Sequence, residues 1–239
     1  MNHAQWRQYF YQSLTSEYIQ SELMELYHWV MEEVYGWNRS QLYFHNQEPL
    51  SEDKRQELES IITRLKNHEP VQHVFQKAYF MDLVLTVNEH VLIPRPETEE
   101  LVDLLLSDFS AKENLNVLDI GTGSGCIPLA IKRYKPAWSV KGVDVSNDAL
   151  TFAKKNAAML DLDVTFESFD ALGDAEIPAC EVVISNPPYI PNAVKPTIER
   201  NVLAFEPHLA LFVSDDDPFV FYKAITEKAN AAGVEGVYF

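Results

Sequence analysis

The amino-acid sequence predicts an α/β protein in which a doubly wound, mostly parallel sheet follows a small helical domain. From residue 116 onward, short apolar runs of strand length alternate with helical stretches, the pattern of a parallel sheet covered by helices. Residues 1–70 instead show apolar residues three and four apart, as in helices. Residues 71–95 are rich in Val, Leu and Phe in alternation, and they predict a β-hairpin linker.

Length, charge and cysteine content narrow the class of protein. The chain has 239 residues, of which 46% are hydrophobic, enough for one large domain together with a small one. Its formal net charge of -17 argues against tight non-specific binding of DNA or RNA, which needs clustered lysine and arginine. Cys126 and Cys180 have no metal-ligand spacing and fit a reducing cytoplasm. We expect no metal site, and no stretch approaches the ~18 apolar residues of a membrane span.

The first region, residues 1–70, is expected to form a small helical bundle. One helix is predicted to end at Gly36, and another to begin at Ser51, a favourable N-cap residue, and to end before Pro70. The stripe expected to be buried in the first helix is Ile19, Leu23, Leu26, Tyr27, Val30 and Val34. This region carries no cluster of reactive side chains, so we assign it to packing or partner recognition.

The second region, residues 71–95, is expected to contain two short strands with a turn at Asn88 and Glu89. The helix that follows begins near Pro96, because proline fits the first helical turn and the acidic residues after it suit the positive end of the helix dipole.

The third region, residues 96–239, contains the alternating elements. Strands are expected over residues 116–121, 139–144, 163–168, 181–186 and 235–239. Helices are expected over residues 126–134, 147–160 and 218–232. The carboxyl ends of parallel strands share one edge of the sheet, where open α/β sheets bind their ligands.

The stretch VLDIGTGSG, which includes the first of these strands, is the strongest binding signal. Gly121, Gly123 and Gly125 allow a sharp turn and let a ligand approach the backbone, ahead of a helix whose free N–H groups can face it. A dinucleotide fingerprint would place its last glycine at position 126, where Cys126 stands. Asp119 fits a cofactor with a cationic amino group, the S-adenosylmethionine pattern. A tight turn that binds no ligand is the alternative.

Acidic residues at the ends of the next two strands extend this signal. Asp144 lies about twenty residues beyond the glycines and can accept hydrogen bonds from both ribose hydroxyls. Asp170 can accept one from an adenine amino group. Each acid alone is also explained by a strand end or a turn. It is the three acids together with the glycine turn that predict a nucleoside-containing cofactor.

The sequence NPPY, residues 186–189, ends the fourth strand beside the expected cofactor. Pro187 and Pro188 lack an N–H donor, which leaves two acceptors: the side-chain oxygen of Asn186 and the carbonyl of Pro187. Two acceptors suit a substrate –NH₂, aim its lone pair at a methyl group on sulfur and stabilise the charge that develops on nitrogen. Tyr189 offers an aromatic wall for a flat amide or base. A rigid turn that merely closes a strand is the alternative.

The combination of NPPY with VLDIGTGSG resembles the amino-methylating class of S-adenosylmethionine-dependent methyltransferases, which act on DNA adenine, ribosomal RNA or protein glutamine. HVLIPRPETEELV, residues 90–102, and NVLAFEPHLALF, residues 201–212, are similar to signatures of the HemK/PrmC family. That family methylates the glutamine of the Gly-Gly-Gln motif in class I peptide chain release factors. The resemblance covers nearly the whole chain and implies a Rossmann-like class I methyltransferase fold with a helical first domain and a hairpin linker.

The resemblance also implies a role for each matching position. Asn186, Pro187 and Tyr189 would be the catalytic residues and, with Pro188, would hold the target glutamine amide. The expected cofactor-binding residues are Arg95, Glu97, Thr98, Asp119, Gly121, Thr122, Gly123, Ser124, Gly125, Asp144, Asp170, Ala171 and Asn186. The cofactor would be S-adenosyl-L-methionine, released as S-adenosyl-L-homocysteine. The chain would be a monomeric, cytoplasmic protein-(glutamine-N5) methyltransferase whose partners are class I release factors, with no direct nucleic-acid or membrane contact.

Three features depart from the family pattern. Ala171 stands where many members carry a bulky side chain, and VSDDDP, residues 213–218, stands where the family has a glycine-rich turn. After Phe239 the family continues with two strands and a helix, so the carboxyl-terminal strands are expected to be missing and an apolar sheet edge to be exposed. We therefore expect lower solubility or weaker cofactor affinity than in a longer chain.

Two alternative functions stay open from the sequence. A nucleic-acid exocyclic-amine methyltransferase, acting on DNA adenine or ribosomal RNA, would share NPPY, although the net charge of -17 and the lack of a basic stripe count against it. A non-catalytic, cofactor-binding adaptor is the second alternative.

Overall fold

The structure is a computed structural model that describes residues 1–239, and it divides into two compact units, Met1–Phe75 and Gln76–Phe239. The first unit extends past residue 70, where we expected the helical region to end, because a short helix, α5 (Val71–Phe75), completes it. Val71 and Val74 are buried in the core of this unit. The guanidinium of Arg64 donates hydrogen bonds to the carbonyls of His73 and Val74 and so ties α5 to the preceding helix.

The first unit is a helical bundle, as predicted. Its longer elements are α1 (His3–Leu14), α2 (Gln20–Tyr35), α3 (Arg39–Phe44) and α4 (Glu52–Lys66). Gly36 ends α2 with a φ of 71°, and the hydroxyl of Ser51 caps α4 by accepting from the N–H of Lys54 at 3.4 Å. Ile19, which we expected to be buried, is 67% exposed because it is the N-cap residue of α2 and lies outside the helical stripe.

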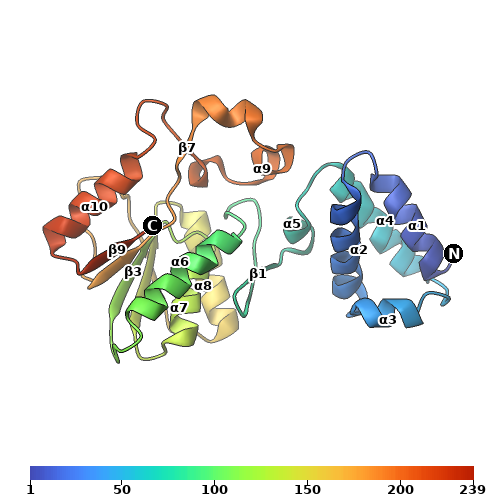
Figure 1. Ribbon diagram of the computed structural model, residues 1–239, viewed down its shortest axis with the longest axis horizontal. Helices are drawn as coiled ribbons and strands as arrows, with labels where there is room; N and C mark the ends of the chain where they lie inside the picture. Colours follow the sequence, from blue (N-terminus) through green and yellow to red (C-terminus); the bar gives the residue numbers. More distant parts are fainter. The chain divides into compact units, whose positions relative to one another are not determined.

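The second unit is built around a five-stranded parallel sheet (Figure 1). Its strands are β3 (Asn116–Ile120), β4 (Ser139–Asp144), β5 (Thr165–Ser168), β6 (Val182–Ile184) and β9 (Gly236–Tyr238). They lie in the order β5-β4-β3-β6-β9, and every neighbouring pair is parallel. The strand order reverses between β3 and β6, so their carboxyl ends form the switch point at which doubly wound sheets bind ligands.

Helices cover both faces of this sheet, as a doubly wound fold requires. On one face lie α6 (Pro96–Asp108), α7 (Cys126–Tyr134) and α8 (Asn147–Leu160), and α10 (Val220–Ala232) lies on the other (Figure 1). Alternate strand residues face the two helical layers. Val117 and Val182 are buried with α6, α7 and α8, whereas Leu118 and Val183 are buried with Ile225 of α10. The predicted fold class is confirmed.

The hairpin that precedes the sheet is shorter than expected and turns at a different place. It consists of β1 (Ala78–Phe80) and β2 (Leu83–Leu85), which pair in antiparallel fashion across a turn at Met81 and Asp82. Asn88 forms a separate turn, in which its side-chain oxygen accepts from the N–H of His90 at 3.0 Å. The expected hairpin turn at Asn88 and Glu89 was therefore wrong. Met81 has a φ of 50°, and its N–H donates to the carboxylate of Glu99 in α6, a contact from outside the hairpin.

The segment between β6 and α10 makes short elements that border the carboxyl edge of the sheet. They are β7 (Ile190–Pro191), the 3-10 helix η1 (Asn192–Thr197), α9 (Arg200–Phe205), the 3-10 helix η2 (His208–Ala210) and β8 (Phe212–Val213). The strands β7 and β8 pair with each other, which fixes the chain directly after NPPY. None of the helices in the structure combines the length and the apolar character that crossing a lipid bilayer requires.

Candidate active site

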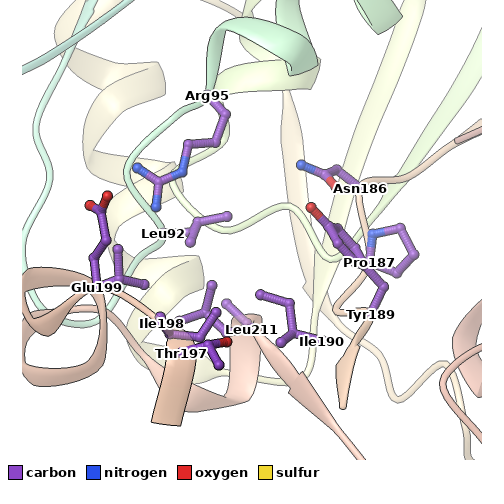
Figure 2. Close-up of a pocket in the computed structure, with 12 residues that line it drawn as sticks. Leu92, Arg95, Asn186, Pro187, Tyr189, Ile190, Thr197, Ile198, Glu199 and Leu211 are labelled. Carbon is purple, nitrogen blue, oxygen red and sulfur yellow. The ribbon is translucent and has the colours of Figure 1, made fainter. Parts of the chain in front are cut away.

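Two cavities meet at the carboxyl edge of the sheet. The larger, of about 320 Å³, is bordered by the glycine turn and the ends of β4 and β5. The smaller, of about 310 Å³, is bordered by residues 197–199 and by Arg95 and Tyr189 (Figure 2). Asn186 and Pro187 line both cavities, so they form a common wall. Two ligands bound in these cavities would come together at this wall.

The glycine turn lies on the wall of the larger cavity and is held by the end of β4. The N–H groups of Gly121 and Thr122 both donate to the carbonyl of Val143, at 2.8 and 3.0 Å. Gly121 and Gly123 have φ angles of 78° and 53°, and a Cβ at either position would meet no protein atom within 4 Å. The backbone at these two glycines is therefore left open for a ligand.

Other members of the glycine turn have structural roles. Gly125, the N-cap residue of α7, has a φ of 82°, and a Cβ there would lie 3.2 Å from the Cβ of Ala153. Thr122 and Ser124 are buried, and neither they nor Gly125 line a cavity. The structure thus places Gly121 and Gly123 on the wall of the larger cavity but places the other three turn residues behind it.

Asp144 lies at the end of β4 and borders the larger cavity. One carboxylate oxygen accepts from the N–H of Gly123 at 2.9 Å, and the other accepts from the N–H of Ser146 at 2.9 Å. Burial raises the pKa of this carboxyl, and the backbone N–H groups of Ser146, Gly123 and Val145 oppose the rise. Each oxygen keeps a second lone pair, so Asp144 can both hold the glycine turn and accept hydrogen bonds from a ligand.

Asp119 is fully buried beneath the glycine turn and lines neither cavity. Neither of its oxygens has a hydrogen-bond partner within the protein. Burial raises the pKa of Asp119 to about 7; the adjacent side chain of Thr122 opposes the rise, and the negative charge of Asp144 adds to it. In this structure Asp119 lies behind the cavity wall, whereas we expected it to face the cofactor's amino group.

The loop after β5 closes the larger cavity with apolar side chains. Asp170 and Ala171 line the cavity, and a side-chain oxygen of Asp170 accepts from the N–H of Leu172 at 2.9 Å. Leu172 and Val145, which also line it, are 46% and 50% exposed. Large apolar side chains exposed at a cavity wall suit the flat face of a base. Leu172 thus places a large apolar side chain next to Ala171 on the cavity wall.

The NPPY loop carries two hydrogen-bond acceptors at the wall between the two cavities. The side-chain nitrogen of Asn186 donates to the hydroxyl of Thr98 at 3.0 Å, and this leaves the side-chain oxygen directed away from that contact. Neither that oxygen nor the carbonyl of Pro187 accepts a hydrogen bond from the protein. Pro188 lines the larger cavity, and Tyr189 lines the smaller one (Figure 2). The two acceptors predicted from the sequence are thus free and lie beside both cavities.

The residues predicted at the start of α6 do not lie together at one cavity. Arg95 lines the smaller cavity and not the larger one, where we expected it. Glu97 is exposed and lines neither cavity, so the structure does not place it at a cofactor site. Thr98 is buried behind Asn186 and acts on the site through the hydrogen bond to that side chain.

Several residues that line the cavities were not predicted as site residues from the sequence. In the larger cavity they include His90, Val91, Leu92, Val145, Ser146, Phe169, Leu172 and Leu209. In the smaller cavity they are Leu92, Ile190, Thr197, Ile198, Glu199, Val202, Ala210 and Leu211. Val145 could have been found, because it directly follows an acid at a strand end. Residues 90–92 and those of 202–211 belong to stretches that resemble the HemK/PrmC signatures, but the sequence did not show which of their side chains face a cavity.

Comparison with known proteins gives two family matches. Residues 5–75 match the family model described as PrmC N-terminal domain, and residues 98–205 match the one described as methyltransferase small domain. The curated relatives that this chain matches include proteins named release factor glutamine methyltransferase, three of which are described here. The protein from Flavobacterium psychrophilum is 38% identical over 94% of this chain and 80% of its own length.

The other two relatives are more similar over a shorter stretch. The protein from Streptococcus pneumoniae is 43% identical over 77% of this chain and 65% of its own length. The protein from Bacteroides thetaiotaomicron is 44% identical over 74% of this chain and 64% of its own length. This chain thus spans between 64% and 80% of the length of these three relatives.

Proposed function

This chain belongs to the release factor glutamine methyltransferase family, and on that premise we propose that it methylates the side-chain amide nitrogen of a glutamine in class I peptide chain release factors. One observation carries the proposal. The free acceptors of Asn186 and Pro187 lie on the wall shared by two cavities, one bordered by the glycine turn and the other by Tyr189. A methyl donor and an amide nitrogen can meet there.

The larger cavity fits S-adenosyl-L-methionine. Gly121 and Gly123 offer a backbone that no Cβ obstructs, and the carboxylate of Asp144 can accept from ribose hydroxyls. Val145 and Leu172 give apolar walls for the adenine. When bound, this cofactor supplies a methyl group on a positively charged sulfur.

The NPPY loop would hold the substrate amide. The side-chain oxygen of Asn186 and the carbonyl of Pro187 accept the two hydrogens of the carboxamide –NH₂ and so fix the plane of the group. An amide nitrogen is a weak nucleophile, because its lone pair is delocalised into the carbonyl. The two oxygens stabilise the positive charge that develops on nitrogen during transfer. The extra proton can leave to water afterwards, so no general base is needed for the transfer itself.

The experiment uses purified protein, labelled S-adenosyl-L-methionine and an unmethylated class I release factor. We expect one methyl group on the glutamine of the Gly-Gly-Gln motif, located by mass spectrometry of the digested factor. A release factor with alanine at that position is the control and should stay unlabelled. Parallel reactions contain DNA or ribosomal RNA in place of the release factor, and label transferred only to these would support a nucleic-acid methyltransferase. Cofactor binding without any transfer would support an adaptor.

The partner and compartment belong to the same proposal. The names of the relatives support release factors as substrates. We place the reaction in the cytoplasm, where release factors act, and we expect the chain to work as a monomer. Size-exclusion chromatography with light scattering would test the last point, since a stable dimer would contradict it.

A further inference from the structure

The smaller cavity contains a donor group that the methyl-transfer step does not use. Arg95 extends from the N-cap position of α6 into this cavity, and Asn186 and Tyr189 lie across from it (Figure 2). The rest of the cavity wall is mostly apolar, formed by Leu92, Ile190, Ile198, Val202, Ala210 and Leu211. Thr197 and Glu199 also line the cavity, and the Arg95 side chain is 35% exposed, so its guanidinium is open to a ligand.

Arg95 is held in place by a buried carboxylate. Its Nη2 atom donates to Oε1 of Glu206 at 2.6 Å, and the side chain of Glu206 is only 2% exposed. The other oxygen of Glu206 accepts from the N–H of Ile93 at 3.1 Å. The carboxylate is therefore shared between the backbone and the guanidinium. This arrangement orients the guanidinium and engages one of its five N–H donors.

The remaining donors have no acceptor within the protein. The contact with Glu206 is the single hydrogen bond that Arg95 makes through its side chain in the structure. The cavity also contains Glu199, but no ion pair joins it to Arg95. A planar group with free N–H donors, fixed at a cavity wall, is suited to bind a carbonyl oxygen of a ligand.

The chemistry of the proposed substrate tells which carbonyl is suited to this donor. A peptide that carries the target glutamine has main-chain carbonyls near the side chain, and the two prolines of NPPY have no N–H to bind them. The carboxamide oxygen is a poor choice. A cation beside it would draw electron density from the amide nitrogen and oppose the positive charge that develops there during transfer. A main-chain carbonyl has no such conflict.

We propose that Arg95 is a substrate-binding residue that donates hydrogen bonds to a main-chain carbonyl of the peptide segment next to the target glutamine. This inference rests on the proposed function and adds a contact to it. Glu206 is the positioning residue that holds Arg95 for this contact. The smaller cavity is then a peptide subsite, and Arg95 has no direct part in cofactor binding.

The test removes Arg95 together with its carboxylate partner. Arg95→Met alone would leave the buried carboxylate of Glu206 unpaired and could unfold the protein. The double variant Arg95→Met/Glu206→Gln avoids this and is compared with the wild type, and Glu206→Gln alone shows how much of the change comes from losing the carboxylate that positions Arg95. Thermal unfolding of both variants shows that they are folded. Calorimetry then gives the Kd for unmethylated release factor in the presence of S-adenosyl-L-homocysteine.

We expect the Kd for release factor to be about ten- to a hundredfold higher in the double variant than in the wild type, the range for a hydrogen bond to a charged group. The Kd for S-adenosyl-L-homocysteine should be equal in the two. The same increase should appear with a release factor whose target glutamine is replaced by alanine, because the contact is to the main chain.

Three results would overturn the inference. An equal Kd for release factor in the double variant and the wild type would mean that Arg95 does not bind the peptide. A change confined to the Kd for S-adenosyl-L-homocysteine would return Arg95 to the cofactor site. An increase that vanishes with the alanine-substituted factor would move the contact to the carboxamide. Because these measurements need no turnover, they are separate from the methylation assay. A wild-type protein that binds release factor but never methylates it would contradict the proposed function and would leave the inference about Arg95 standing.

Discussion

The side-chain nitrogen of Asn186 donates a hydrogen bond to the hydroxyl of Thr98 at 3.0 Å. The two residues are 88 positions apart in the sequence, and Thr98 is 5% exposed at the start of α6. The contact sets which end of the Asn186 amide faces the cavities. With the nitrogen bound to Thr98, the oxygen is the end left to accept from a substrate.

Replacing Thr98 with valine keeps the shape of the side chain but removes the acceptor. The Asn186 amide is then free to rotate, so we expect kcat to fall about tenfold, the effect of losing roughly one hydrogen bond. Thr98→Ser keeps the hydroxyl and should restore most of the rate. Steady-state methylation of release factor gives kcat, and calorimetry should show an unchanged Kd for S-adenosyl-L-homocysteine. A wild-type kcat in Thr98→Val would exclude this positioning role.

Gly123 and Gly233 form a matched pair for testing the glycine turn. Both have a positive φ, 53° and 71°, and a Cβ at either would meet no protein atom within 4 Å. Alanine at either position should cost about 1–2 kcal/mol of unfolding free energy, because the left-handed conformation disfavours a Cβ. Of these two glycines, Gly123 lines the larger cavity and Gly233 does not. We therefore expect Gly123→Ala to weaken cofactor binding at least about tenfold, beyond that strain, and Gly233→Ala to leave it unchanged. Equal cofactor affinity in both would show that the turn does not contact the cofactor.

Asp119 should make the stability of the protein depend on pH. Its pKa is raised from 3.8 to about 7 in the folded state, so the folded protein binds a proton more tightly than the unfolded chain does. The contribution of this group to stability is complete below the unfolded pKa and declines as pH rises through the folded pKa. The wild type should therefore lose about 2–3 kcal/mol more than Asp119→Asn between about pH 5 and about pH 8.

Urea unfolding of the wild type and of Asp119→Asn at several pH values measures this difference. Asparagine keeps the shape of the side chain but does not titrate in this range, so contributions from other groups cancel in the comparison. Parallel stability curves for the two proteins would mean that the carboxyl of Asp119 is not perturbed in the folded state.

Leu172 should contribute to cofactor affinity through its apolar surface. It is 46% exposed on the wall of the larger cavity, and Leu104, which is 52% exposed on α6, lines neither cavity. Leu172→Ala should raise the Kd for S-adenosyl-L-homocysteine about five- to tenfold, since the surface lost is of the order of 1–1.5 kcal/mol. Leu104→Ala is the control and should not change it. If calorimetry gives the same Kd for both variants, Leu172 does not touch the base.

The sheet and its helices could be predicted because their signals are local. The helices expected over residues 126–134 and 147–160 are those found, and the glycine turn lies where the spacing of Gly121 and Gly123 indicated. The acceptors of NPPY follow directly from the absence of an N–H in Pro187 and Pro188. These features depend on residues within one turn or one strand, so a single sequence is enough to find them.

The features that could not be predicted from the sequence depend on contacts between residues far apart in the chain. The hairpin turn at Met81 has no glycine or asparagine signal, and its N–H is satisfied by Glu99 from another element. The position of Arg95 in the smaller cavity follows from its ion pair with Glu206, 111 residues away. Asp119 was expected to face a ligand because of its place before the turn, but the packing of the sheet buries it completely. No local pattern carries this information.

The most direct test is the single-turnover rate of methyl transfer at saturating release factor in Asn186→Ala and Asn186→Asp. If the side-chain oxygen of Asn186 holds the amide hydrogens, the alanine variant should lose at least about a hundredfold in rate, comparable to the loss of one stabilising group at a reacting centre. The aspartate variant keeps acceptor oxygens and should fall between alanine and the wild type. The Kd for S-adenosyl-L-homocysteine should change by less than about threefold, or under 1 kcal/mol. A wild-type rate in Asn186→Ala would contradict the account.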